Sequence, residues 1–212
     1  MKLSSSQILL WLRWIALTVI GGTSGLLITM ILLPGNLFFF GSYVAAAVLA
    51  CTGQWLILDK LIKARKGWIA TGLIGLIAPM LLLMSAAHLS ALADSHNLFL
   101  RDLLAYLGVG IGALLVGLLL GNLQRAAILQ RCLNETKGWT LTTGLAWGLG
   151  WALGTAIPGI DPSTSGDPLR IVLGWIVTWL IIGSITGALL LYLLPSRRVE
   201  PALEAAQESK SS

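Results

Sequence analysis

The sequence predicts an all-α membrane protein, a bundle of six transmembrane helices, and three observations support this fold class. Hydrophobic side chains make up 56% of the 212 residues and charged ones only 11%, whereas soluble domains carry about 25% charged residues. The charges are clustered rather than scattered. Five stretches contain no charge and are each as long as the roughly 20 apolar residues that cross a bilayer as a helix: 15–58, 67–93, 103–124, 138–160 and 171–196.

The first stretch, 15–58, is long enough for two helices, and Pro34-Gly35-Asn36 divides it. Proline lacks an amide hydrogen, and glycine and asparagine tolerate turn geometry, so a tight hairpin is expected there. Each remaining stretch holds one helix. These helices form a single domain over 1–195, and the polar residues 196–212 are expected to form a mobile cytoplasmic tail. The six predicted spans are about 11–33, 37–58, 68–87, 102–123, 139–157 and 171–194.

The basic residues predict the orientation of the chain. Twelve of the 14 lysines and arginines fall on one side of the predicted bundle, and only Arg101 and Arg170 fall on the other. Short loops rich in basic residues stay in the cytoplasm, so both chain ends are predicted to be cytoplasmic and the protein to lie in the cell inner (plasma) membrane. This asymmetry and attraction to anionic headgroups explain the net charge of +5, and no nucleic-acid partner is expected. The twelve are Lys2, Arg13, Lys60, Lys63, Arg65, Lys66, Arg125, Arg131, Lys137, Arg197, Arg198 and Lys210.

Two predicted helical hairpins share a sequence pattern, which indicates an internal repeat. The first hairpin has Gly53-Gln54-Trp55 near the end of one helix and Lys66-Gly67-Trp68 where the next helix starts. The second has Gly121-Asn122-Leu123-Gln124 and Lys137-Gly138-Trp139 in the same places. The glutamine and the later tryptophan are 14 positions apart in the first hairpin and 15 in the second. Both hairpins are predicted to have the same membrane orientation, so the repeat is parallel rather than inverted.

The candidate functional polar residues are Gln54, Gln124 and Asn122. Each glutamine is predicted about one helical turn inside the cytoplasmic surface, where it either hydrogen-bonds a neighbouring helix or contacts a substrate. The tryptophans of both hairpins are expected at the membrane interface, with the indole N–H among the lipid headgroups.

These hairpin motifs resemble a group of uncharacterised small polytopic bacterial proteins that are frequent in cyanobacteria. The resemblance also includes the Trp-Gly-Leu-Gly-Trp-Ala-Leu-Gly stretch at 147–154 and a Gly-x-x-x-Gly-x-x-Leu close of the last helix, and it covers about 45–195. Arg125 departs from the pattern, which favours tryptophan at that position. The resemblance implies a multi-pass membrane fold and no particular activity. A cyanobacterial source would add the thylakoid as a second candidate membrane.

Glycines four residues apart recur in the predicted helices. Small residues at this spacing lie on one helix face and let two backbones approach closely. They predict either a compact bundle or an interface between chains, so the expected partners are the bilayer and other membrane subunits or a second copy. The six pairs are Gly21 with Gly25, Gly108 with Gly112, Gly117 with Gly121, Gly144 with Gly148, Gly150 with Gly154, and Gly183 with Gly187.

The sequence contains few candidates for catalytic or metal-binding residues. Apart from Arg13 near the start of the first span and Asp102 at the first position of the fourth, no Asp, Glu, Lys, Arg or His lies within a predicted span, which argues against pumps, proton-coupled carriers and voltage sensors. Gly22-Thr23-Ser24-Gly25 resembles a motif of intramembrane serine proteases, but it lies on the first helix, and His88 and His96 are expected in a later loop. Either histidine could bind a pigment magnesium or a metal, the other interpretation being an exposed loop histidine. We expect no catalytic residue, no bound metal and no cofactor.

Two functions remain open. The glycine faces and the uncharged spans favour a non-enzymatic subunit, scaffold or assembly factor of a membrane complex. The alternative is a small neutral-solute transporter or the membrane substrate-binding subunit of an importer. The chain is similar to such subunits of vitamin importers in size and predicted topology only.

Overall fold

A computed structural model of the chain describes residues 4–33, 35–62, 67–92, 98–133, 136–157 and 168–194. Helices account for 94% of these described residues, and no strand occurs among them, so the all-α class is confirmed. The elements are α1 (Ser5–Leu32), α2 (Gly35–Ile62), α3 (Gly67–Thr71), η1 (Gly72–Leu76), α4 (Ala78–Ser90), α5 (Leu98–Gln124), η2 (Arg125–Leu129), α6 (Gln130–Cys132), α7 (Trp139–Ala156) and α8 (Pro168–Leu193).

Four helices are long and apolar enough to cross a membrane, namely α1, α2 over Gly41–Ile62, α5 over Phe99–Gln124, and α8. Together with α7 they coincide with five of the predicted spans, although α1 begins six residues earlier and α2 ends four residues later than predicted. α7 is 18 residues long and includes three tryptophans, four threonines and four glycines. These residue types lower its mean hydropathy, so α7 is not among the four.

The prediction of one continuous helix over 68–87 is wrong. The segment is α-helical over α3, 3₁₀-helical over η1 and α-helical again over α4. Pro79 lies in the first turn of α4. It has no amide hydrogen to donate to the carbonyl of residue 75, so the regular α-helical hydrogen bonding is interrupted at this point. In the first turn of a new helix the missing donor is not needed, and α4 therefore starts here.

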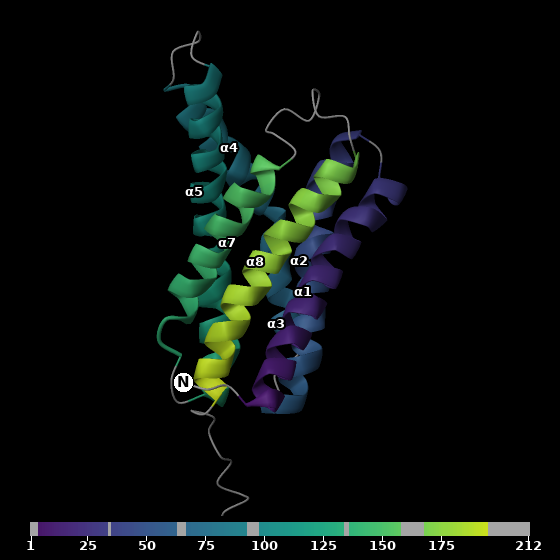
Figure 1. Cartoon of the computed structure of the whole chain (residues 1–212), viewed down its shortest axis with the longest axis vertical. Helices are drawn as coiled ribbons and strands as arrows, with labels where there is room; N and C mark the ends of the chain where they lie inside the picture. The colour runs from purple at the N-terminus through teal and green to yellow at the C-terminus, as the bar shows by residue number, and fades with distance from the viewer. Residues whose placement is uncertain are drawn as a thin grey trace, which may run out of the picture.

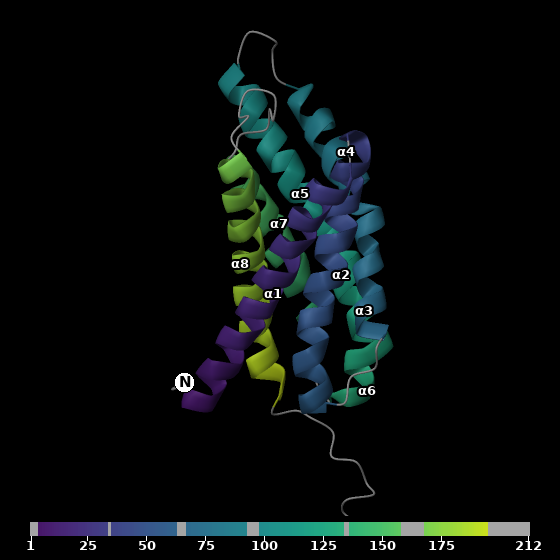
Figure 2. The same ribbon diagram turned by 90° about the vertical axis from the view of Figure 1, so that its right-hand side faces the viewer.

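The helices form one closed bundle. Around it, α2 packs on α1 and on the α3–η1 segment, α4 packs on α5, α5 on α7, α7 on α8, and α8 returns to α1. Figure 1 shows α5, α7, α8 and α1 side by side, with α2 and the broken third segment behind them. The start of α1, the end of α2 and α6 lie at one end, which we call the basal end (Figure 2). The opposite end, where α2 and α8 start, is the distal end.

All six glycine pairs lie where two helices of this chain approach each other. A Cβ atom built on Gly21 would lie 2.6 Å from the Leu49 carbonyl carbon of α2, and one built on Gly117 would lie 2.7 Å from the Thr143 carbonyl oxygen of α7. Neither position has room for a side chain unless a helix moves. Gly21 and Gly25 face α2, Gly108 and Gly112 face α4, Gly117 and Gly121 face α7, Gly144 and Gly148 face α5, Gly150 and Gly154 face α8, and Gly183 and Gly187 face α1.

The second glycine of a pair is packed as closely as the first. A Cβ atom built on Gly112 would lie 2.7 Å from the Leu81 carbonyl oxygen, and one built on Gly148 would lie 3.0 Å from the Gly110 carbonyl oxygen. Of the two interpretations of the glycine faces, the structure contains the compact bundle, since each pair is used within the chain. An interface between chains through these same faces has no room.

We expect Gly21→Ala to lower the free energy of unfolding by about 1–3 kcal/mol relative to a glycine-to-alanine change in open space, because its methyl group overlaps the α2 backbone. Gly67→Ala is the matched control, since the nearest atom to a Cβ built on this helical glycine is Ile128 Cδ1 at 4.0 Å. Thermal unfolding of both variants in one detergent measures the difference. Equal stabilities would contradict the close contact of α1 with α2.

Candidate functional site

Two buried glutamines organise the basal end of the bundle. Gln54 in α2 and Gln124 in α5 have only 7% and 2% of their surface exposed. Each accepts a hydrogen bond from the tryptophan near the start of a following helix. Trp68 Nε1 donates to Gln54 Oε1 at 3.3 Å, and Trp139 Nε1 donates to Gln124 Oε1 at 3.1 Å. Because an indole N–H can only donate, these contacts determine which end of each amide faces the ring.

The predicted location of Trp68 and Trp139 among the lipid headgroups is wrong. Both side chains lie inside the bundle, with 0% and 1% of their surface exposed. A buried indole needs an acceptor for its N–H, and the glutamine carbonyl supplies one within the protein. Of the two roles expected for Gln54 and Gln124, the structure contains the hydrogen bond between helices, and a substrate contact stays a hypothesis.

The glutamine amide nitrogens extend these contacts to further helices. Gln54 Nε2 donates to Thr18 Oγ1 of α1 at 3.1 Å, and Gln124 Nε2 donates to Thr71 Oγ1 of α3 at 3.4 Å. Each threonine hydroxyl then donates to a carbonyl one turn earlier in its own helix, at 2.8 Å from Thr18 and 2.6 Å from Thr71. Both glutamines are therefore bonded at both ends of the amide.

A third tryptophan completes the arrangement, because Trp14 Nε1 of α1 donates to Thr186 Oγ1 of α8 at 3.1 Å. These bonds connect α7, α5, α3, α2, α1 and α8 one after another. We call the set the glutamine network, and its members are Trp14, Thr18, Gln54, Trp68, Thr71, Gln124, Trp139 and Thr186.

Apolar packing closes the basal end around this network. Trp68 makes edge-to-face contacts with Trp14, at 6.4 Å between ring centroids, and with Trp139, at 5.9 Å. Directly after Gln124 the chain makes the π-helical turn η2, which contributes Leu129 to the same cluster. The leucines around the rings have at most 1% of their surface exposed, and they are Leu58, Leu129, Leu133, Leu190 and Leu193.

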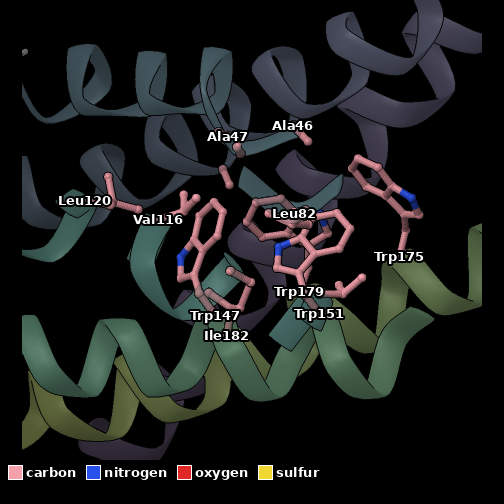
Figure 3. Packing of buried hydrophobic residues seen from close by; sticks show 14 of the residues in the cluster. Ala46, Ala47, Leu82, Val116, Leu120, Trp147, Trp151, Trp175, Trp179 and Ile182 are labelled. Atoms are coloured by element: carbon pink, nitrogen blue, oxygen red, sulfur yellow. The ribbon is translucent and has the colours of Figure 1, made fainter. Parts of the chain in front are cut away.

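A second aromatic group is formed by Trp147 and Trp151 of α7 with Trp175 and Trp179 of α8 (Figure 3), and Tyr43 of α2 packs against it; we call these five residues the tryptophan cluster. Trp151 is stacked on Tyr43 at 4.9 Å and lies edge-to-face with Trp175 at 5.2 Å. Trp147 and Trp179 lie edge-to-face at 5.8 Å. The indole nitrogens of Trp151 and Trp179 are buried and have no hydrogen-bond partner among the described residues.

The sequence reasoning missed this cluster, although a signal for it exists. Trp147 and Trp151 are four residues apart, as are Trp175 and Trp179, and residues four apart share one face of a helix. Two such faces indicate buried aromatic stripes. Which helices bring them together depends on how the bundle packs.

The other candidate residues lie apart from these two groups. Asn122 is exposed on α5. The placement of His88 in a loop is wrong, because α4 continues to Ser90 and carries His88 exposed in its last turn. His96 lies outside the described residues. Within the part of the chain that the structure describes, no group of three or more His, Cys, Asp or Glu side chains could hold a metal ion.

Comparisons with protein-family models, with curated proteins and with solved structures gave no match to this chain. The resemblance to small polytopic bacterial proteins therefore stays a prediction.

We expect Gln124→Leu to lower the free energy of unfolding by about 1–3 kcal/mol, because it leaves the buried N–H of Trp139 without an acceptor. Trp139→Phe in the same chain should recover part of this loss, since it removes the unpaired donor. Detergent unfolding of the two single variants and the double variant gives the coupling, for which about 1 kcal/mol is expected.

Trp151→Phe is the matched control for Trp139→Phe. It removes an indole N–H that has no partner among the described residues, so it should destabilise the protein less. Strictly additive losses for Gln124→Leu and Trp139→Phe would show that the hydrogen bond between them contributes nothing.

Proposed function

We propose that the chain crosses the membrane six times, with both ends in the cytoplasm and the two Gln–Trp hairpins as a parallel repeat. α7 and the broken third segment run alongside the four membrane-length helices in both views (Figures 1 and 2). The same indole-to-glutamine hydrogen bond in both hairpins supports the repeat. Large apolar side chains are exposed on the helices, as a lipid-facing surface requires; examples are Ile20, Leu56, Leu83, Leu107, Leu149 and Leu180.

Single-cysteine labelling in a cysteine-free background tests this topology. Cysteines placed at positions 2 and 210 should react with a membrane-impermeant reagent only after cells are opened, whereas one at position 94 should react in intact cells. Labelling at positions 2 and 210 from opposite sides would contradict an even number of spans.

We further propose that the bundle binds a small neutral solute, as a transporter or as the substrate-binding subunit of an importer. The tryptophan cluster carries this proposal, because it gathers five large aromatic side chains where small residues would suffice to pack helices. Ligand sites are lined mainly by apolar and aromatic side chains with a few placed polar groups. The break in the third segment gives further support. Ile74 of η1 and Ala78 of α4 pack in the core that holds the cluster, and interrupted helices accompany solute sites in transporters.

Thermal unfolding of the purified protein with a panel of neutral metabolites tests this proposal. A solute at about 100 times its Kd should stabilise the folded protein by about 2.7 kcal/mol, and proteoliposomes should take up or retain the same compound. Carboxylate analogues of each hit serve as the control and should have no effect. Stabilisation by no compound would contradict a solute-binding function.

A scaffold or assembly role is the second candidate, and one feature of the surface favours it. α5 and α7 each expose a leucine or isoleucine at every fourth position, and such ridges fit the grooves of a partner helix. The glycine faces that first suggested this role are occupied within the chain. The ridges are Leu103, Leu107, Ile111, Leu115, Leu119 and Leu123 on α5, and Leu141, Leu145, Leu149 and Leu153 on α7.

Co-purification tests the scaffold role. A stable partner should be recovered with the natural chain and lost with the Leu115→Trp variant. Leu83→Trp, at an exposed position of α4, is the control and should retain the partner. A protein that purifies alone, without a partner, would contradict the scaffold role.

A further inference from the structure

We propose that the tryptophan cluster binds a flat, uncharged ring compound with carbonyl oxygens, and that Trp151 and Trp179 donate hydrogen bonds to those oxygens. The inference rests on the proposed solute-binding function, because it names the chemical class of the solute and the two groups that recognise it.

The unpaired donors are the first step. Trp151 and Trp179 each have 2% of their surface exposed, and neither indole nitrogen has a hydrogen-bond partner in the described part of the chain. Trp14, Trp68 and Trp139 are buried to the same degree, and each donates to a glutamine or threonine oxygen. A buried donor without an acceptor destabilises a fold, and a bound molecule that supplies the acceptor removes this cost.

The neighbouring rings do not replace an oxygen acceptor. Trp179 lies edge-to-face with Trp147 at an interplanar angle of 82°, and Trp151 lies edge-to-face with Trp175 at 83°. An N–H that points at an aromatic face forms a much weaker bond than one that points at a carbonyl. Both indole N–H groups would therefore form a stronger hydrogen bond with a carbonyl oxygen of a ligand.

The surroundings of the donors determine the rest of the ligand. Ala46, Ala47, Leu82 and Val116 pack in the same core as the cluster (Figure 3), and Ala78 belongs to this core as well. A charged ligand placed among such side chains would lose its hydration without gaining an opposite charge. Indole and phenol rings instead favour a flat partner that can stack on them or meet them edge-on. The ligand is therefore expected to be planar and neutral.

Within the tryptophan cluster, the two members nearest the distal end are the least covered, which points to entry of the ligand from that end. At the basal end, Trp68 and Leu129 have 0% of their surface exposed. Nearer the distal end, Tyr43 is partly exposed and Trp175 is 9% exposed. A ligand would reach Trp151 from the distal end, which the predicted topology places outside the cytoplasm, as an importer requires.

The experiment uses the full chain with ¹⁵N-labelled tryptophan in lipid nanodiscs. The indole N–H signals are assigned from single Trp→Phe variants and followed by NMR. The probe is duroquinone, a flat neutral ring with two carbonyl oxygens, and durene is its matched control without oxygens. Duroquinone should shift the Trp151 and Trp179 signals in a saturable way and leave Trp68 and Trp139 unchanged. Durene should shift neither donor.

Affinities of the variants for duroquinone complete the test. Trp151→Phe and Trp179→Phe keep an aromatic ring and remove the donor, so each should weaken binding about fivefold, the value of one ordinary hydrogen bond. Trp11→Phe is the control, because it removes an indole donor outside the cluster, where Trp11 Nε1 of α1 donates to the Ser184 carbonyl of α8 at 3.0 Å, and it should change the affinity less than twofold. If a variant does not fold, the shifts of the indole N–H signals in the natural chain still test the proposal.

Three results would overturn the proposal: no saturable shift at either donor, equal shifts with durene, or unchanged affinity in both donor variants. A metabolite that binds without moving these two signals would leave the solute-binding function standing and show that this site is wrong. Saturable shifts with duroquinone in a protein that takes up no solute would support the site and contradict transport.

Discussion

Hydrogen-bonding groups inside a membrane-embedded bundle must find their partners in the protein, because hydrocarbon offers none. The glutamine network meets this requirement at the basal end. Its indoles donate to glutamine carbonyls or a threonine hydroxyl, and its glutamine amides donate to threonine hydroxyls. These side chains reach one another only because the helices lie close together. The glycines between α1 and α2 and between α5 and α7 allow this close approach.

Two regions of the interior differ in whether their buried indole N–H groups meet this requirement. In the glutamine network every indole N–H has an acceptor, and the leucines around it are almost completely covered. In the tryptophan cluster the Trp151 and Trp179 donors are unsatisfied among the described residues. In the first region the hydrogen bonds join helices, whereas the second region contains two indole donors that are equally buried and still available to an acceptor. This difference locates the candidate site more clearly than any single motif does.

Most helix positions could be predicted from the sequence, because an uncharged stretch of about 20 residues in lipid has to be helical. The break at η1 could not, although Pro79 marks its end, since a proline in a membrane helix can also produce only a kink. The burial of Trp68 and Trp139 depends on acceptors 14 and 15 residues earlier, which come near only when the hairpins close. The tryptophan cluster depends on the pairing of α7 with α8, which no local spacing encodes.

The glutamine network is an open chain whose two ends lie on the neighbouring helices α7 and α8. It begins with Trp139 on α7 and finishes on α8, where Thr186 donates to the Ile182 carbonyl of its own helix. The Thr143 hydroxyl of α7 likewise donates a hydrogen bond within its own helix, to the Trp139 carbonyl. Side-chain hydrogen bonds of the network join the other five pairs of neighbouring helices, whereas α7 and α8 are held by close packing, with Gly150 and Gly154 of α7 against α8. The Thr178 hydroxyl donates to the Gly150 carbonyl at 3.2 Å, so this hydrogen bond and the ring contacts of the tryptophan cluster join α7 to α8 where the network does not.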